Sequence, residues 1–214
     1  KADFGIAHDG DGDRVIFCNS FGEVIPGDKI LGLLAVHEQE YKRLLNNNFV
    51  ATIHSNSGLD MSLKQQGIVL HRADVGDRKV AEMMRNKKSN LGGESSGHLI
   101  ASDFLPTGDG LLTALLVARA SYESGKSIDS LSDKITLWPS VEGAFRVNKK
   151  IPIQECESLS SNLSKAKARL GKDGRVLLRY SGTEPKIRLL VEATQQSRAK
   201  EEFDCLVKTI EKTL

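Results

Sequence analysis

Three aspartates at alternate positions of one short segment are the residues of this sequence best suited to chemistry. Asp9, Asp11 and Asp13 are separated by glycines and followed directly by Arg14, whose guanidinium can pair with a phosphate. Magnesium prefers hard oxygen ligands at about 2.0–2.1 Å, and glycines let the backbone curl until three carboxylates converge on one ion. An EF-hand calcium loop is excluded, because Arg14 stands where that loop needs Gly and Ser20 where it needs Glu. The segment therefore predicts a catalytic divalent-metal loop, with a solvated acidic turn as the alternative.

A second candidate site is the glycine-rich segment 92–98, which contains Glu94, Ser96 and His98. Glu94 and Ser96 place an acceptor and a hydroxyl close together, as is needed to hold vicinal sugar hydroxyls. His98 titrates near neutral pH when it is unperturbed and could orient or transfer a proton. The alternative is a glycine-rich turn whose serines bond to their own backbone, because such turns are common.

A third candidate site lies in the segment 179–188, where two arginines flank a loop with two hydroxyls and a glycine. Hydroxyls and backbone N–H groups in a tight turn form a concave anion-binding site, and arginines add bidentate bonds to phosphate. The segment therefore favours phosphate binding over an exposed polar hairpin. The candidate residues are Arg179, Ser181, Gly182, Thr183 and Arg188.

Asp77 and Arg78 stand at the predicted start of a helix. The N–H groups at a helix N-terminus attract anions, so both residues are candidates for placing a bound ligand. The alternative is that Asp77 is a first-turn residue that only complements the helix dipole.

The composition is that of an ordinary globular protein, with a formal net charge of +2 over 214 residues. The basic residues are scattered and aromatic residues make up 5% of the chain, which does not indicate nucleic-acid binding. No apolar run reaches the length of a membrane span. Cys18, Cys156 and Cys205 are odd in number and widely spaced, which favours reduced thiols in the cytoplasm over disulfides or a zinc site. Because the chain opens at Lys1 and soon enters an apolar segment, we expect a fragment of a longer protein.

Short strands and helices alternate in the first part of the chain. Residues 3–8 and 14–19 are predicted to be strands that flank the aspartates. Asp28 is predicted to cap a helix that runs to about residue 45. Further strands are expected at 49–54 and 68–71, and further helices at 59–66, from residue 78 to about 86, and at 109–124. This alternation indicates a parallel α/β layer.

The pattern of predicted strands and helices changes after residue 131, which predicts a second domain. Residues 132–140 are expected to form a linker. The predicted order beyond it is strand (141–147), helix (155–170), two strands (174–180 and 186–193) and helix (197–213). Paired strands with helices packed on one face indicate a small α+β domain.

Taken in order, the three loops resemble those of the α-D-phosphohexomutase superfamily, whose members have a metal loop, then a GE-x-S sugar loop, then a C-terminal phosphate loop. Residues 55–59, 75–78, 107–110 and 181–185 are most similar to the bacterial phosphoglucosamine mutases of that superfamily. The resemblance covers essentially the whole chain. It implies a phosphohexomutase-type α/β domain with a mixed sheet, followed by a small α+β C-terminal domain with an antiparallel sheet.

The resemblance also implies a place for this chain in a four-domain protein. Residues 1–27 would be the end of domain 2 with the metal-binding loop, 28–131 would be domain 3 with the sugar-binding loop, and 140–214 would be domain 4 with the phosphate-binding loop. Domain 1 would be missing, and with it the family's phosphoserine, because this sequence has no Ser-His motif. The fragment alone would then be inactive, and the full-length protein could form a homodimer.

The implied activity is the interconversion of glucosamine 6-phosphate and glucosamine 1-phosphate, through a phosphoserine and a 1,6-bisphosphate, in the supply of peptidoglycan precursors. Mg²⁺ would be the cofactor, and glucosamine 1,6-bisphosphate or glucose 1,6-bisphosphate the primer. The implied roles are metal ligation by Asp9, Asp11 and Asp13, catalysis by Arg14 and His98, substrate binding by Asp77, Arg78, Glu94 and Ser96, and phosphate anchoring by Arg179, Ser181, Gly182, Thr183 and Arg188.

One position departs from the family pattern. Ser95 occupies the variable position of the sugar loop, where Gln is expected in many phosphoglucosamine mutases. A phosphomannomutase or phosphoglucomutase therefore stays open as an alternative, and so does a non-catalytic sugar-phosphate binding module. The intact aspartate triplet favours an enzyme, because sugar binding alone has little need of magnesium.

Overall fold

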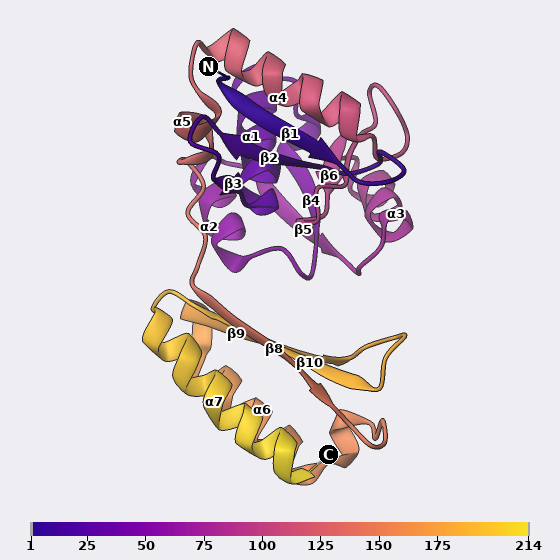
Figure 1. Ribbon diagram of the computed structural model, residues 1–214, viewed down its shortest axis with the longest axis vertical. Coiled ribbons are helices and arrows are strands. Elements are labelled where there is room, and N and C mark those ends of the chain that lie inside the picture. Colours follow the sequence, from indigo (N-terminus) through magenta and orange to yellow (C-terminus); the bar gives the residue numbers. More distant parts are fainter. Residues whose placement is uncertain (1, 214) are drawn as a thin grey trace. The chain divides into compact units, whose positions relative to one another are not determined.

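The computed structural model describes residues 2–213 and divides into two compact units, Lys1–Leu137 and Trp138–Leu214 (Figure 1). The end residues Lys1 and Leu214, which belong to the predicted domain ranges, lie outside the described residues. Each unit has a hydrophobic core of its own. The first unit is α/β and the second is a small α+β unit, so the predicted fold class is confirmed.

The first unit begins with a three-stranded antiparallel sheet in the order β1-β2-β3. Its strands are β1 (Phe4–His8), β2 (Val15–Asn19) and β3 (Val24–Ile25). Successive side chains of a strand point to opposite faces, and accordingly Val15 and Phe17 are buried whereas Ile16 is exposed. The two strands predicted around the aspartates are confirmed, whereas β3 is too short to give a periodic signal.

The second sheet of this unit is mixed and has the order β5-β4-β6-β7. Its strands are β4 (Asn48–Thr52), β5 (Val69–Ala73), β6 (Leu91–Gly93) and β7 (Leu99–Ala101). β4 pairs in parallel with β5 and β6, but β7 runs antiparallel to β6. The loop 94–98 between β6 and β7 is too short for the crossover that parallel strands require. This corrects the parallel layer expected from alternation and confirms the mixed sheet expected from the resemblance.

Five helices pack around these two sheets, and α4 lies along β1 and β2 (Figure 1). They are α1 (Gly27–Glu40), α2 (Ser57–Gln65), α3 (Asp77–Lys87), α4 (Gly110–Ser124) and α5 (Ile128–Ser132), with a short 3₁₀ turn η1 (Leu45–Asn47). The predicted bounds of α2, α3 and α4 agree with these to within two residues. α5 is too short to show helical periodicity in the sequence.

The prediction for α1 is wrong at both ends. Pro26, whose ring fixes φ, occupies the N-cap position, and Asp28 does not cap the helix. The Asp28 carboxylate instead accepts a hydrogen bond from the backbone N–H of Asn56 (2.9 Å). The helix ends at Glu40, because the chain reverses at Lys42, whose φ is +58°.

The second unit is a three-stranded antiparallel sheet in the order β8-β10-β9, with two helices on one face (Figure 1). Its elements are β8 (Ser140–Arg146), η2 (Ile153–Glu155), α6 (Glu157–Leu170), η3 (Gly171–Asp173), β9 (Gly174–Tyr180), β10 (Lys186–Ala193) and α7 (Gln196–Thr213). Alternate residues of β10, namely Ile187, Leu189 and Val191, are buried in the core with the helices. The five main elements predicted here are confirmed.

Among the described helices α7 is the longest, with 18 residues, and charged side chains are spread along its length. Among the described residues, no helix combines the length and the apolar character needed to cross a membrane.

A group of charged side chains ties α1 to α4 on the first unit. The Glu123 carboxylate accepts hydrogen bonds from Arg43 Nη2 (2.7 Å) and from the ring of the buried His37 (2.8 Å). Glu38 bonds to Arg43 Nε (3.0 Å) and to Arg119 (2.5 Å). Chiefly because of the hydrogen bond from Arg43, the pKa of Glu123 falls from 4.5 to about 2.

The depressed pKa of Glu123 predicts acid-sensitive stability. A carboxylate whose pKa is lower in the folded than in the unfolded chain stabilises the fold fully above about 4.5, and this contribution is lost as the pH falls towards about 2. We therefore expect Glu123→Gln to lower the urea midpoint of the first unit at neutral pH. The difference from wild type should shrink at about pH 3. A difference that is the same at both pH values would contradict this account.

Candidate functional site

The acidic loop, residues 9–14, joins β1 to β2 and gathers the three aspartates. One carboxylate oxygen from each of Asp9, Asp11 and Asp13 lies within 4.8 Å of the others. Asp9 and Asp11 are exposed, whereas Asp13 is partly buried. Asp13 Oδ1 is buried and has no hydrogen-bond partner among the described residues. Hard carboxylate oxygens at this spacing, one of them unsatisfied, fit a divalent cation such as Mg²⁺.

Arg14 closes the acidic loop. Its backbone N–H donates to Asp9 Oδ1 (3.3 Å), and its Nε lies 3.8 Å from Asp9 Oδ2 and 3.9 Å from Asp13 Oδ1. The guanidinium is about half exposed, so it balances the acidic charge while staying accessible to an anion.

The sugar loop, residues 94–98, is a tight connection between β6 and β7. The Glu94 N–H donates to the His98 carbonyl oxygen (2.8 Å), and the Gly97 N–H donates to the Glu94 carbonyl oxygen (3.1 Å). Ser96 Oγ lies 3.5 Å from Glu94 Oε2. The carboxylate and the hydroxyl that the sequence singles out are therefore adjacent, as two partners of neighbouring sugar hydroxyls must be.

The structure brings the acidic loop and the sugar loop together. Arg14 and His98 form an antiparallel bridge, and the Val15 N–H donates to the Gly97 carbonyl oxygen (3.2 Å). His98 Nε2 lies 3.7 Å from Asp13 Oδ2. An open hollow of about 220 Å³ borders both loops, and its lining includes Asp9, Arg14 and Ser96.

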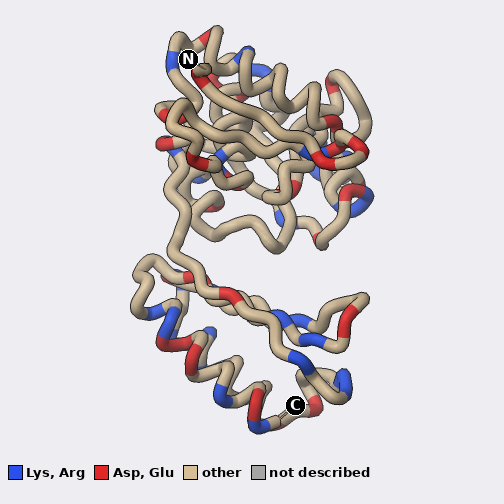
Figure 2. Tube along the Cα trace, viewed as in Figure 1, with Lys and Arg blue, Asp and Glu red and all other residues tan. Residues whose placement is uncertain are grey.

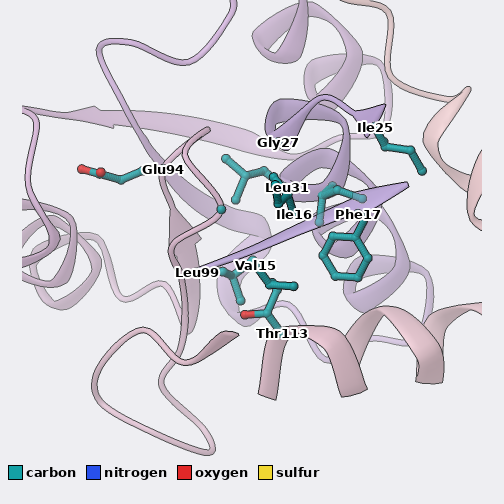
Figure 3. Close-up of a pocket in the computed structure, with 11 residues that line it drawn as sticks. Val15, Ile16, Phe17, Ile25, Gly27, Leu31, Glu94, Leu99 and Thr113 are labelled. Carbon is teal, nitrogen blue, oxygen red and sulfur yellow. The ribbon is translucent and has the colours of Figure 1, made fainter. Parts of the chain in front are cut away.

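An apolar seam formed by residues of β2, α1 and β7 lies next to this junction (Figure 3). Val15 and Phe17 of β2 meet Leu31 of α1 and Leu99 of β7 around a cavity of about 10 Å³. Figure 3 shows Glu94 pointing away from these apolar side chains. Beside this seam, Asp9, Arg14 and Ser96 stay exposed.

His98 is the most enclosed of the candidate residues in this unit, with 4% of its surface exposed. Its Nδ1 is buried without a hydrogen-bond partner among the described residues, whereas its Nε2 faces Asp13. Nε2 is therefore the ring nitrogen directed at the acidic loop.

Asp77 and Arg78 begin α3, and both are exposed. Asp77 Oδ1 accepts a hydrogen bond from the Arg78 N–H (2.7 Å). The connection to the sugar loop is made by the preceding residue, Gly76, whose N–H donates to Glu94 Oε1 (2.7 Å). Gly76 has φ +120°, a value that favours glycine, and sequence reasoning missed its part in holding Glu94.

The phosphate loop, residues 181–185, joins β9 to β10 in the second unit. The Ser181 N–H donates to the Lys186 carbonyl oxygen (2.8 Å), and the Glu184 N–H donates to Ser181 Oγ (3.3 Å). Lys150 Nζ donates to the Ser181 carbonyl oxygen (2.6 Å). Ser181 is thus buried inside a hydrogen-bonded turn, whereas Gly182 and Thr183 are exposed.

Positive charge gathers on the strands next to the phosphate loop (Figure 2). Arg179 and Arg188 are direct cross-strand partners, as are Arg146 and Lys186. Glu184 accepts hydrogen bonds from Lys186 Nζ (2.5 Å) and Arg188 Nη2 (3.0 Å), which hold the pKa of Glu184 below its ordinary value. Arg179 Nε is buried and has no hydrogen-bond partner among the described residues. Like charges placed opposite each other repel, and an anion would relieve that repulsion.

Two protein-family models match the chain. The model "Phosphoglucomutase/phosphomannomutase, alpha/beta/alpha domain III" covers residues 26–137, and "Phosphoglucomutase/phosphomannomutase, C-terminal domain" covers residues 142–208.

Similar proteins carry consistent names. The phosphoglucosamine mutase of Maricaulis maris is 45% identical over 196 residues, which are 92% of this chain and 44% of the relative. The phosphoglucosamine mutase of Nitratidesulfovibrio vulgaris is 42% identical over 214 residues, which are 100% of this chain and 48% of the relative. The chain therefore spans about half the length of these relatives.

A solved structure shares the fold. Aspergillus fumigatus N-acetylphosphoglucosamine mutase, in complex with GlcNAc-6P and magnesium, has a TM-score of 0.77 at 18% identity, covering 96% of this chain and 51% of that chain. The resemblance seen in the sequence is confirmed by the two family models and by the relatives. The chain belongs to the phosphoglucomutase/phosphomannomutase family.

Proposed function

We propose that this chain is part of a phosphosugar mutase that interconverts glucosamine 6-phosphate and glucosamine 1-phosphate. The observation that carries the proposal is the junction of the acidic loop with the sugar loop at Arg14 and His98. A site that must hold both a transferring phosphoryl group and a sugar needs these two kinds of ligand side by side. The relatives named phosphoglucosamine mutase support the choice of sugar.

The acidic loop is the part proposed to serve phosphoryl transfer. Asp9, Asp11 and Asp13 would hold Mg²⁺, which neutralises charge on phosphate oxygens when it is bound. Arg14 would pair with the same oxygens. His98, with Nε2 directed towards Asp13, would handle a proton at the reacting hydroxyl.

The remaining candidates are proposed to hold the substrate. Glu94 and Ser96 would bind sugar hydroxyls, with Asp77 and Arg78 placing the ligand at the start of α3. A remote grip on the phosphate that is not reacting uses binding energy to position the reacting end. That grip is assigned to Arg179, Ser181, Gly182, Thr183 and Arg188.

The whole protein is proposed to have four domains, with residues 1–27 ending domain 2, 28–131 forming domain 3 and 140–214 forming domain 4. A phosphoserine would come from domain 1, outside this chain, and glucosamine 1,6-bisphosphate or glucose 1,6-bisphosphate would prime the reaction. The substrate would be a hexosamine phosphate, and the full-length protein could form a homodimer.

Asp11→Asn tests the metal assignment. The change keeps the side chain's size but removes one charge from the cluster, so Mn²⁺, used in place of Mg²⁺, should bind about tenfold more weakly or worse. Binding is measured by calorimetric titration of the 214-residue chain. Asp204→Asn, at an exposed position of α7, is the matched control and should leave affinity unchanged. Equal affinity in the two variants would remove the metal from the acidic loop.

Arg179→Ala tests the phosphate loop. Affinity for glucosamine 6-phosphate should fall by about 1.5–3 kcal/mol, the range for hydrogen bonds to charged groups. The melting temperature should not fall, because the change also removes a like charge opposite Arg188. Arg198→Ala, on α7 at the other face of the sheet, is the control. Unchanged phosphosugar affinity in Arg179→Ala would overturn the assignment.

Phosphorus NMR tests the reaction itself. The chain alone should not convert glucosamine 6-phosphate in the presence of Mg²⁺ and glucose 1,6-bisphosphate. The reason is that phosphate-monoester chemistry is very slow without its full catalytic apparatus. A chimera in which this chain replaces the matching segment of the Maricaulis maris relative should form glucosamine 1-phosphate.

The chimera also separates the alternatives. If the chimera converts mannose 6-phosphate or glucose 6-phosphate faster than glucosamine 6-phosphate, the chain is assigned to the phosphomannomutases or phosphoglucomutases. A folded chimera that binds phosphosugars but transfers no phosphoryl group would favour a binding module. Turnover by the isolated chain would contradict the need for a serine from another domain.

A further inference from the structure

The turn Gly108–Gly110, whose last residue begins the long helix α4, contacts both the acidic loop and His98. None of its residues is among the candidates that the sequence singles out for chemistry. Its contacts nevertheless reach the residues on both sides of the aspartate run, namely the His8 ring and the Arg14 carbonyl oxygen. The inference below rests on the metal role proposed for these aspartates.

The first contact is a hydrogen bond to the middle of the acidic loop. Gly110 is the first residue of α4, and its N–H, like the other first amides of a helix, has no partner within the helix. It donates instead to the carbonyl oxygen of Gly12 (2.9 Å). Gly12 separates Asp11 from Asp13 and has φ +74°, so this bond fixes the turn between two carboxylates.

The second contact closes the base of the acidic loop. A Cβ atom on Gly110 would lie 2.6 Å from the Arg14 carbonyl oxygen, 2.6 Å from His8 Nδ1 and 2.8 Å from the Gly12 carbonyl oxygen. His8 and Arg14 are the residues on either side of the aspartate run, and they are themselves linked by His8 Nδ1 and the Arg14 carbonyl oxygen (3.2 Å). A side chain at position 110 would therefore push the two ends of the loop apart.

Gly108 makes the same close approach to His98. A Cβ atom on Gly108 would lie 2.1 Å from His98 Nε2, the atom that faces Asp13. Neither Gly108 nor Gly110 has a positive φ, so the backbone conformation alone does not call for glycine. Alanine is also the better helix former at position 110. Close approach to the acidic loop and to His98 is the remaining reason for both glycines.

We propose that Gly110 is a positioning residue for the divalent metal, and that the Asp109 cap of α4 holds it in place. The Asp109 carboxylate accepts the Leu112 N–H (2.7 Å), and the Thr113 hydroxyl donates to the Asp109 carbonyl oxygen (2.7 Å). These bonds fix the first turn of α4, and the Gly110 amide then sets the spacing of the carboxylates. Mutation of residues that contact the metal ligands rather than the metal typically lowers metal affinity by about 10–100-fold.

The test measures Mn²⁺ binding to the 214-residue chain by calorimetry, with the EPR line shape as a report on ligand arrangement. Gly110→Ala should weaken Mn²⁺ binding about tenfold or more and change the line shape. Melting of the metal-free chain is followed in parallel, because a purely structural role would lower the melting temperature without changing the metal's surroundings.

A pair of variants at Asp109 tests the same role without adding bulk next to the acidic loop. Asp109→Ser and Asp109→Ala both remove one charge, but only serine keeps a capping oxygen. Asp109→Ala should bind Mn²⁺ several-fold more weakly than Asp109→Ser. This pair decides the matter if Gly110→Ala does not fold.

The outcomes separate this inference from the proposed function. A folded Gly110→Ala with wild-type affinity, or equal affinity in the two Asp109 variants, overturns the positioning role and leaves the metal assignment intact. A wild-type chain that binds no Mn²⁺ overturns the metal assignment and this inference with it.

Discussion

The backbone pairing between the start of β2 and the sugar loop is the constraint on which the first unit depends. The Val15 N–H bonds to the Gly97 carbonyl oxygen, and Arg14 and His98 form the adjacent bridge. A shift of one residue in strand pairing would turn every side chain to the opposite face. The pairing therefore keeps Val15 in the apolar seam and brings Asp13 Oδ2 to 3.7 Å from His98 Nε2. The same strand register therefore determines both the packing of the apolar seam and the placement of the candidate site residues.

Such close pairing leaves no room for side chains at several points, and glycine occupies them. A Cβ on Gly27 would lie 2.0 Å from the Ser95 carbonyl oxygen, and one on Gly97 would lie 2.3 Å from the Val15 carbonyl oxygen. At the start of α4, Gly110 approaches the acidic loop and Gly108 approaches the His98 ring in the same way. The loops are thus held by backbone against backbone, which positions functional groups more rigidly than contacts between flexible side chains do.

In the second unit, the corresponding feature is a pair of like charges on neighbouring strands. Arg179 stands directly opposite Arg188, and only the latter is bonded to Glu184. A folded chain selected for stability alone would not keep two like charges on facing positions. Groups that bind anions are commonly less than optimal for stability, because the ligand completes their interactions. The sheet can accommodate the repulsion between these two arginines, since its other face packs against α6 and α7 in a continuous core.

The long periodic elements and the three loops follow from the sequence by itself, because local spacing dictates them. Strands such as β9 and β10, the helix α4 and the aspartate run that begins at Asp9 have strong local signals, whereas the segments with Glu94 and Arg179 become specific only in combination with that run. The end of α1, the role of Asp28 and the short strands β6 and β7 have no such signals. The helix ends beside a residue with positive φ, Asp28 bonds to a distant segment, and each of the two strands has only three residues. The predicted roles of the site residues stay predictions. Only the tertiary structure decided that Gly76 holds Glu94 and that His98 faces Asp13, because contacts between segments distant in the chain have no local signature in the sequence.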